Sequence, residues 1–250
     1  MNSHSGDCLM MEPEFDPDRL KPLVRVFAPD PRNTLFAKVN LTSGAISPMG
    51  LADHHDAISA YILHDGVPEG ISIQFETVKN IYLYAWFVYR FFTIAEHHAY
   101  SCLELALRER LTNEIASGEL GSKRPGLRRL LSYAADHHFI RNEGFSRWRN
   151  RGQINSRHRV EMQKIREASE FGIENVSWNE SEIEVTEEDL NWDYVRVLIE
   201  TLPMLRNEYA HGSQNLLNGA SSIIEVVGEI INQLFEAPPT EISEPGGTLN

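Results

Sequence analysis

The chain has 250 residues, of which 42% are hydrophobic and 24% charged, so it can bury a sizeable core. Its formal charge of −13 at pH 7 argues against nucleic-acid binding by the chain as a whole. The first 18 residues lack a secretory pattern, the longest apolar run (81–95) is interrupted by Arg90, and only Cys8 and Cys102 could form a disulfide. We therefore expect a soluble cytoplasmic protein with no membrane contact.

Taken in chain order, the first segment is irregular. Residues 1–70 are rich in Pro, Gly and Asp, and they predict short strands within 23–27 and 35–39 and a short helix over 52–63. Apolar residues then recur in steps of three and four, at Ile81, Tyr84, Val88, Phe91, Ala95, Ala99, Cys102 and Ala106. This spacing predicts one long helix from Phe75 to Leu111.

The remaining elements are also helical. We expect a helix from Leu127 through His138, a basic loop, and a polar helix over 157–171. Thr186 and the acidic residues after it resemble a helix start, and Pro203 should kink or restart that helix. A final helix follows Gly212 and ends at Pro238, after which residues 238–250 are expected to be disordered. The sequence thus predicts a mostly α fold, with four to five main helices forming a bundle over residues 71–237.

The charge is unevenly distributed along the chain. Residues 123–166 carry twelve basic and three acidic residues, a local formal charge of +9, which leaves −22 for the remainder. This basic insert mixes arginines with Trp148, a combination that suits a phosphate backbone and stacked bases. The predicted RNA-binding residues are Lys123, Arg124, Arg128, Arg147, Trp148, Arg149 and Arg151. Alternatively, the same arginines neutralise the acidic run 174–189 of this chain or of a partner.

A short motif near the C-terminus carries the most chemical information. Arg206-Asn207 precedes His211-Gly212 by a few residues, between two apolar helical stretches. Histidine transfers protons near neutral pH, and arginine holds phosphate through a fork of donors. A structural alternative exists, because basic residues in a last helical turn complement the helix dipole and a following glycine often ends a helix.

The pattern Arg206-Asn207-x-x-x-His211, placed between the last two long helices, resembles the HEPN superfamily of helical domains. As architecture the resemblance covers about residues 75–236, but its specific part is the short motif. In this family an arginine and a histidine stand four to six residues apart, often with a polar residue after the arginine. The resemblance implies a helical bundle that acts as a metal-independent endoribonuclease.

The resemblance also implies roles and partners. His211 would transfer the proton, Arg206 would hold the scissile phosphate and Asn207 would orient one of them, with no cofactor and no metal. Five positions correspond to about 140° of rotation on a helix, so Arg206 and His211 do not share a face. A homodimer whose paired motifs form one composite site, as in this family, removes that difficulty. RNA is the implied substrate, with a toxin or defence role.

Two other interpretations stay open. Adjacent histidines occur in three pairs (His54-His55, His97-His98, His137-His138), but they point about 100° apart on a helix and lack a familiar zinc spacing, which makes a metal enzyme a distant alternative. The main alternative is a catalytically inactive helical module that dimerises and binds a partner or nucleotide. The resemblance also implies a regulatory protein partner, but Ser213 stands where some HEPN toxins carry the tyrosine that the antitoxin modifies, which argues against regulation by that route.

Overall fold

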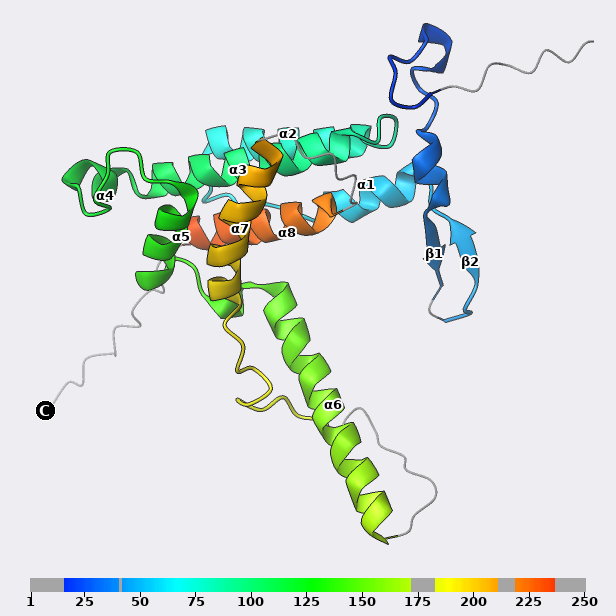
Figure 1. Ribbon diagram of the computed structural model, residues 1–250, viewed down its shortest axis with the longest axis vertical. Coiled ribbons are helices and arrows are strands. Elements are labelled where there is room, and N and C mark those ends of the chain that lie inside the picture. Colours follow the sequence, from blue (N-terminus) through cyan, green and yellow to red (C-terminus); the bar gives the residue numbers. More distant parts are fainter. Residues whose placement is uncertain (1–15, 41, 172–182, 211–218, 237–250) are drawn as a thin grey trace, which may run out of the picture.

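The computed structural model describes residues 16–40, 42–171, 183–210 and 219–236, and it is mostly α-helical (Figure 1). This confirms the predicted fold class. The α-helices are α1 (Leu51–Ser59), α2 (Glu69–Tyr84), α3 (Phe91–Arg110), α4 (Thr112–Ser117), α5 (Leu127–Asp136), α6 (Ser146–Phe171), α7 (Tyr194–Ala210) and α8 (Ala220–Phe235). Short 3₁₀ turns η1 (Leu23–Arg25), η2 (Pro31–Leu35) and η3 (Asn142–Gly144) and strands β1 (Ala37–Val39) and β2 (Ile46–Pro48) complete the described elements.

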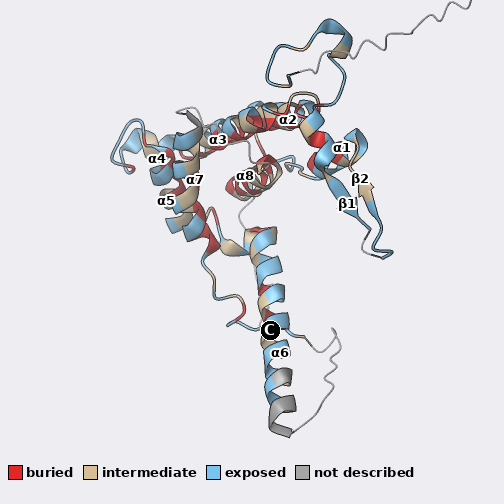
Figure 2. Cartoon of the chain, turned by 45° about the vertical axis from the view of Figure 1, so that its right-hand side comes forward, coloured by how far each residue is buried: buried red, intermediate tan, exposed pale blue. Residues whose placement is uncertain are grey.

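The hydrophobic core lies where α2 and α8 pack against α3, the helix that also contacts α5 and α7. Helix α3 presents the small, fully buried side chains of Ala95, Ala99 and Ala106 to its neighbours, which lets them approach closely. Between α2 and α8, the Phe75 ring lies against Gly228, where an added Cβ would stand 2.9 Å from the ring. Figure 2 shows the buried residues concentrated on these helices. The core therefore fixes the positions of α5 and α7 relative to α3.

The single long helix predicted from Phe75 to Leu111 is wrong, because the chain breaks between α2 and α3. Two side chains from the N-terminal part of the chain hold the break. The Asn33 amide donates to the carbonyl oxygens of Ala85 and Trp86 (2.9 Å each), and the Asp30 carboxylate accepts the Tyr89 N–H (3.1 Å). Asp30 and Asn33 are both buried. Their side chains therefore bond the backbone groups that a continuous helix would have paired internally.

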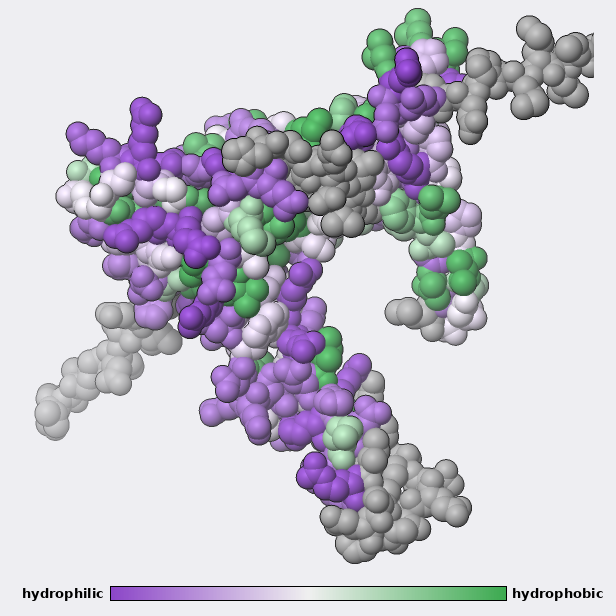
Figure 3. All heavy atoms as spheres, in the orientation of Figure 1, coloured by the Kyte–Doolittle hydropathy of each residue, from purple (hydrophilic) through white to green (hydrophobic). Residues whose placement is uncertain are grey.

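The loop predicted before residue 157 is also wrong, since α6 begins at Ser146 and includes seven of the twelve basic residues of the insert. The carboxylate of Glu229 on α8 accepts the Ser146 N–H (2.8 Å), which satisfies an amide in the first turn of the helix. Helix α6 then projects from the bundle, with mostly exposed and hydrophilic residues (Figures 2 and 3). A helix that is polar on all sides is typical of an element that extends into solvent.

The helix expected from Thr186 begins instead at Tyr194. The Asp189 carboxylate accepts the Thr186 N–H (2.9 Å). This local side-chain bond stabilises a turn in place of the first turn of a helix. Helix α7 then runs through Pro203 as one helix rather than restarting there.

The N-terminal lobe, defined here as residues 16–50, stands at one end of the bundle (Figure 1). Its strands β1 and β2 pair antiparallel, with Lys38 opposite Ser47. The strand predicted within 23–27 is wrong, because that segment contains η1 and its large apolar side chains are exposed, as Figure 3 also shows. No helix in the described ranges has both the length and the apolar character needed to cross a bilayer.

Candidate functional site

Arg206 and Asn207 line a cleft of about 770 Å³ between α7 and the first turns of α5. Helix α3 contributes Glu104 to its wall, and α5 contributes Arg128 and Arg129. Both arginines of α5 are exposed. The packing of α5 and α7 on α3 therefore brings together residues that are up to 103 positions apart in the sequence. Three cationic side chains face this cleft against one carboxylate.

Two long hydrogen bonds hold the Arg206 guanidinium. One of its terminal nitrogens donates to Glu104 Oε2 and the other to Asn207 Oδ1, each at 3.3 Å. Glu104 is bound more tightly to Arg108, whose Nη2 lies 2.6 Å from Glu104 Oε1 and also donates to the Pro125 carbonyl. The side chain of Arg206 is 41% exposed, so its contact with Glu104 is worth at most about 1 kcal/mol. Arg206 is thus oriented toward the cleft, and no strong ion pair neutralises its charge.

The first turn of α5 adds backbone donors to the same cleft. The N-cap residue is Gly126, which has no side chain that could accept a hydrogen bond from the backbone N–H groups. Leu127, Arg128 and Arg129 occupy the first helical positions. The N–H groups of a first helical turn have no partner within the helix, and the helix dipole makes that end favourable for anions. With Arg128, Arg129 and Arg206 around it, this end of the cleft has the chemistry of a phosphate site.

His211, the predicted proton-transfer residue, lies outside the described residues, as do Gly212 and Ser213. In the sequence it directly follows Ala210, the last residue of α7. The described part of the motif is therefore Arg206 and Asn207.

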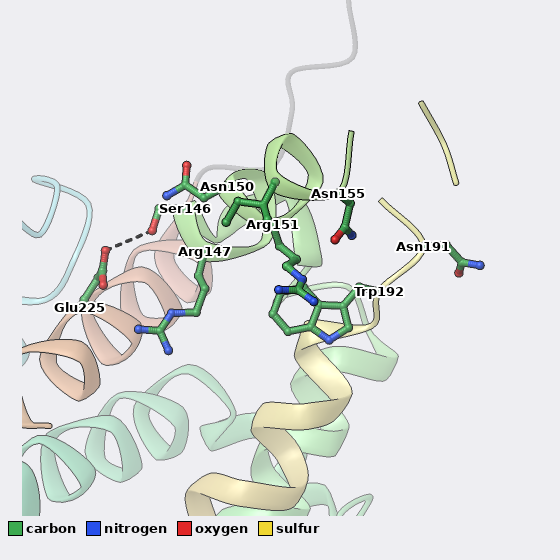
Figure 4. Close-up of a pocket in the computed structure, with 9 residues that line it drawn as sticks. Ser146, Arg147, Asn150, Arg151, Asn155, Asn191, Trp192 and Glu225 are labelled. Atoms are coloured by element: carbon green, nitrogen blue, oxygen red, sulfur yellow. Dashed lines mark hydrogen bonds between the residues drawn. The ribbon is translucent and has the colours of Figure 1, made fainter. Parts of the chain in front are cut away.

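The other predicted RNA-binding residues divide into two groups. Arg147 and Arg151 line a second cleft, of about 750 Å³, beside Asn150, Asn155, Asn191 and Trp192 (Figure 4). Arg149 points elsewhere, since its Nη1 donates to the Glu143 carbonyl (2.6 Å), and Lys123 and Arg124 are exposed between α4 and α5 without lining either cleft.

Trp148, the predicted stacking residue, does not line the second cleft. Its ring is half-buried against the core, and its Nε1–H donates to the Trp192 carbonyl (2.7 Å). The aromatic side chain in the cleft is Trp192, which sequence reasoning missed. In the sequence, Trp192 stands between Asn191 and Asp193, just after an acidic run. No local pattern connects that position with the basic segment about 40 residues earlier.

One arginine of the basic insert does pair with the acidic run. Arg159 donates through Nε and Nη2 to the Asp189 carboxylate (3.0 and 2.8 Å), and this bond lowers the pKa of Asp189 well below its ordinary value. The neutralisation alternative therefore holds for this pair. Arg151 differs, since no hydrogen bond or ion pair joins it to the described residues.

The histidine pairs do not assemble a metal site in the described ranges, where no three His, Cys, Asp or Glu side chains come together. His54 is a core residue: its ring stacks on Tyr82 with centroids 4.4 Å apart, its Nε2 lies 2.8 Å from the Tyr82 carbonyl, and burial lowers its pKa. Cys102 is likewise buried, which raises the pKa of its thiol to about 12. An inert thiol of this kind is unsuited to nucleophilic chemistry.

Comparisons of the chain with protein-family models, with curated protein sequences and with solved structures find no match.

Proposed function

We propose that the protein is a metal-independent endoribonuclease of HEPN type, with Arg206, Asn207 and His211 at its active site. The observation that carries the proposal is the position of Arg206: weakly tethered, partly exposed, and in a cleft with Arg128, Arg129 and the first turn of α5. A cleft that gathers three guanidinium groups around one carboxylate favours a phosphate ligand. The motif places a histidine five residues after that arginine.

The chemistry needs few protein groups, because RNA supplies its own nucleophile. A base removes the proton of the ribose 2′-hydroxyl, the 2′-oxygen attacks the adjacent phosphorus, and the bond from phosphorus to the 5′-oxygen breaks as that oxygen takes a proton. Imidazole, with an ordinary pKa near 6.5, suits either proton transfer. Arg206 would stabilise the charge that develops on the non-bridging oxygens. The products carry a 2′,3′-cyclic phosphate and a 5′-hydroxyl.

A homodimer is part of this proposal. Because Arg206 and His211 are about 140° apart on an ideal helix, one copy of the motif presents them on different faces. Two copies related by a two-fold axis would supply the arginine and the histidine from different protomers to one cleft. A toxin or defence role, kept in check by a regulatory protein, is part of the same proposal, because the resemblance to HEPN ribonucleases implies it.

The test is cleavage of a generic RNA in the presence of a chelator by wild type and by the His211→Ala variant. We expect the substitution to lower the rate by roughly 10²–10⁴-fold, the usual contribution of a general acid or base. His55→Ala is the matched control, because His55 is an exposed histidine of α1 whose ring lies 3.5 Å from the carboxylate of neighbouring Asp56. Cleavage that survives in His211→Ala, with the circular dichroism spectrum unchanged, would contradict the assignment.

One observation favours a second candidate, a catalytically inactive helical module in which Arg206 is structural: the contact between Arg206 and Glu104 joins α7 to α3. If the role of Arg206 is to join α7 to α3 through this contact, then Arg206→Ala should lower the melting temperature and leave any RNA interaction unchanged. If Arg206 holds phosphate, the same variant should melt near wild type and lose cleavage.

A further inference from the structure

The second cleft lies along one face of α6. The helix contributes Ser146 at its start and then a single helical stripe with three- and four-residue spacing: Arg147, Asn150, Arg151, Ile154 and Asn155. Trp192 faces them from the segment before α7, and Glu225 of α8 closes the end opposite Trp192 (Figure 4). The cleft thus offers one aromatic face, two guanidinium groups and several amides within about 750 Å³.

Trp192 is firmly anchored although it is only half-buried. Its carbonyl accepts the Trp148 indole N–H, and its ring lies 4.8 Å from that of Tyr194, at an angle of 40°. Tyr194 in turn packs edge-on against the fully buried ring of Phe145, with the centroids 5.2 Å apart. An indole fixed in this way loses little freedom when a flat ligand stacks on it.

The polar groups around Trp192 are largely uncommitted. Arg151 has no hydrogen-bond or ion-pair partner in the described part of the chain, and the same holds for the side-chain amides of Asn150 and Asn191. The Asn155 amide donates one hydrogen bond to the Asp189 carbonyl (2.9 Å), which leaves its oxygen available. The free guanidinium of Arg151 suits phosphate, and free amides suit the polar edges of a base.

Carboxylates of α8 form the end of the cleft that lies away from Trp192. Glu225 accepts the Ser146 hydroxyl (3.1 Å), and the neighbouring Glu229, whose pKa is raised by burial, accepts the Ser146 N–H. These carboxylates would repel phosphate from the Glu225 end. A phosphate is therefore directed toward Arg151, the cation nearer Trp192 in Figure 4.

We infer that this cleft binds one nucleotide of single-stranded RNA, with its base stacked on Trp192 and its phosphate on Arg151. The ligand follows from the chemistry: the bases of a duplex are stacked on each other, so an indole reaches only an unpaired base. Arg166, exposed on the same helix 15 residues after Arg151, supplies a further cation that a strand could reach and a free nucleotide could not, which favours a strand as the ligand. The inference rests on the proposed function only in taking RNA as the ligand.

Binding is measured by fluorescence anisotropy with a labelled octanucleotide, the duplex of the same sequence, and unlabelled mononucleotides as competitors. The full chain is used in the His211→Ala background, so that binding is read whether or not the protein cleaves RNA. We expect Trp192→Ala to weaken binding of the single strand by roughly five- to hundredfold, the usual effect of losing one stacking aromatic, and Trp192→Phe to restore most of it. Arg151→Ala should weaken binding and reduce the salt slope by about one.

Arg19→Ala is the matched control, because Arg19 is an exposed arginine of the N-terminal lobe paired with Asp16. Single-strand affinity unchanged in both Trp192→Ala and Arg151→Ala would overturn the inference, as would equal affinity for the duplex. Displacement of the strand by a mononucleotide at equal concentration would overturn the assignment to a strand and identify a free-nucleotide site. Binding without cleavage by the wild type would leave this inference standing while the proposed function fails, so the two outcomes are distinct.

Discussion

Arg206 is held by two long hydrogen bonds. Because these bonds are weak, a ligand can replace them at little cost. Its partner Glu104 is bound at 2.6 Å to Arg108, so the carboxylate orients Arg206 without neutralising it. A phosphate would replace one hydrogen bond of 3.3 Å by a charge-assisted bidentate pair, which is shorter and stronger. The sequence motif identified Arg206 and Asn207, but Glu104 stands 102 positions away from Arg206 and no local pattern connects them.

Replacing the carboxylate tests this arrangement. Glu104→Gln keeps a hydrogen-bond acceptor for Arg108 and removes the charge that competes with phosphate. We expect a KM for RNA that is two- to fivefold lower, an unchanged kcat, and a loss of stability of no more than about 1 kcal/mol, because the pair is partly exposed. Steady-state kinetics and thermal unfolding measure both effects. A kcat that falls sharply with the fold intact would instead place Glu104 among the catalytic residues.

At the other end of the bundle, Asp18 joins the N-terminal lobe to the break between α2 and α3. Hydrogen bonds from Arg90 and Arg32 lower the pKa of Asp18 from 3.8 to about 2. Because the pKa is lower in the folded state, the stabilisation is complete above about pH 4 and is lost as the pH falls toward 2. We expect attachment of the lobe to weaken over this interval.

Limited proteolysis by an acid-active protease between pH 4 and pH 2 measures that attachment. The lobe of wild type should become more susceptible as the pH falls, whereas Asp18→Asn should be susceptible throughout, with a flatter dependence on pH. Asp56→Asn is the control, since the Asp56 side chain is 82% exposed. A wild-type profile that does not change over this interval would argue against the role of Asp18.

Among the elements, α6 packs closely against the segment before α7 at a residue without a side chain. Gly152 faces Leu190, where an added Cβ would lie 2.4 Å from the Leu190 Cδ2 atom. Glycine costs about 1 kcal/mol relative to alanine inside a helix, so the close contact with the segment before α7 explains its presence. That segment also carries Trp192, and the contact therefore helps to shape the second cleft.

Gly152→Ala should displace Leu190 and destabilise the protein by about 1–3 kcal/mol, the usual cost of overpacking, despite the better helix propensity of alanine. Tryptophan fluorescence should shift as Trp192 moves, and chemical denaturation measures the free energy of unfolding. Gly70→Ala in α2 is the control, because its added Cβ meets no atom within 4 Å. If Gly152→Ala is as stable as Gly70→Ala, the contact with Leu190 is not tight in solution.

The elements differ in how far local sequence predicted them. Helix α5 was predicted to within a few residues, because its apolar periodicity is local and Gly126 marks its start. The break between α2 and α3 was missed because Asp30 and Asn33 impose it from outside the helix, and the start of α6 was missed because Glu229 caps it from α8. The same holds for the sites: the arginines were identifiable, while Glu104 and Trp192 join them only through tertiary packing.

At the scale of the whole molecule, the formal charge of −13 conceals two cationic clefts at opposite ends of α7. Trp192 precedes the helix, and Arg206 stands twelve residues after its first residue, about 18 Å along the axis. A strand that reaches both clefts along one protomer must span about five nucleotides at a stacked spacing of about 3.4 Å. The acidic remainder of the surface would then keep RNA away from other faces.

The end groups of cleaved RNA test the central claim most directly. A single-stranded RNA longer than about five nucleotides is incubated with wild type in excess chelator, and the fragments are analysed by mass spectrometry. An arginine and a histidine acting on a 2′-hydroxyl should leave 2′,3′-cyclic phosphate and 5′-hydroxyl ends, and one 2′-deoxy sugar at the cut should block cleavage there. Fragments ending in 3′-hydroxyl and 5′-phosphate, cleavage that requires a divalent cation, or no cleavage at all would contradict the account.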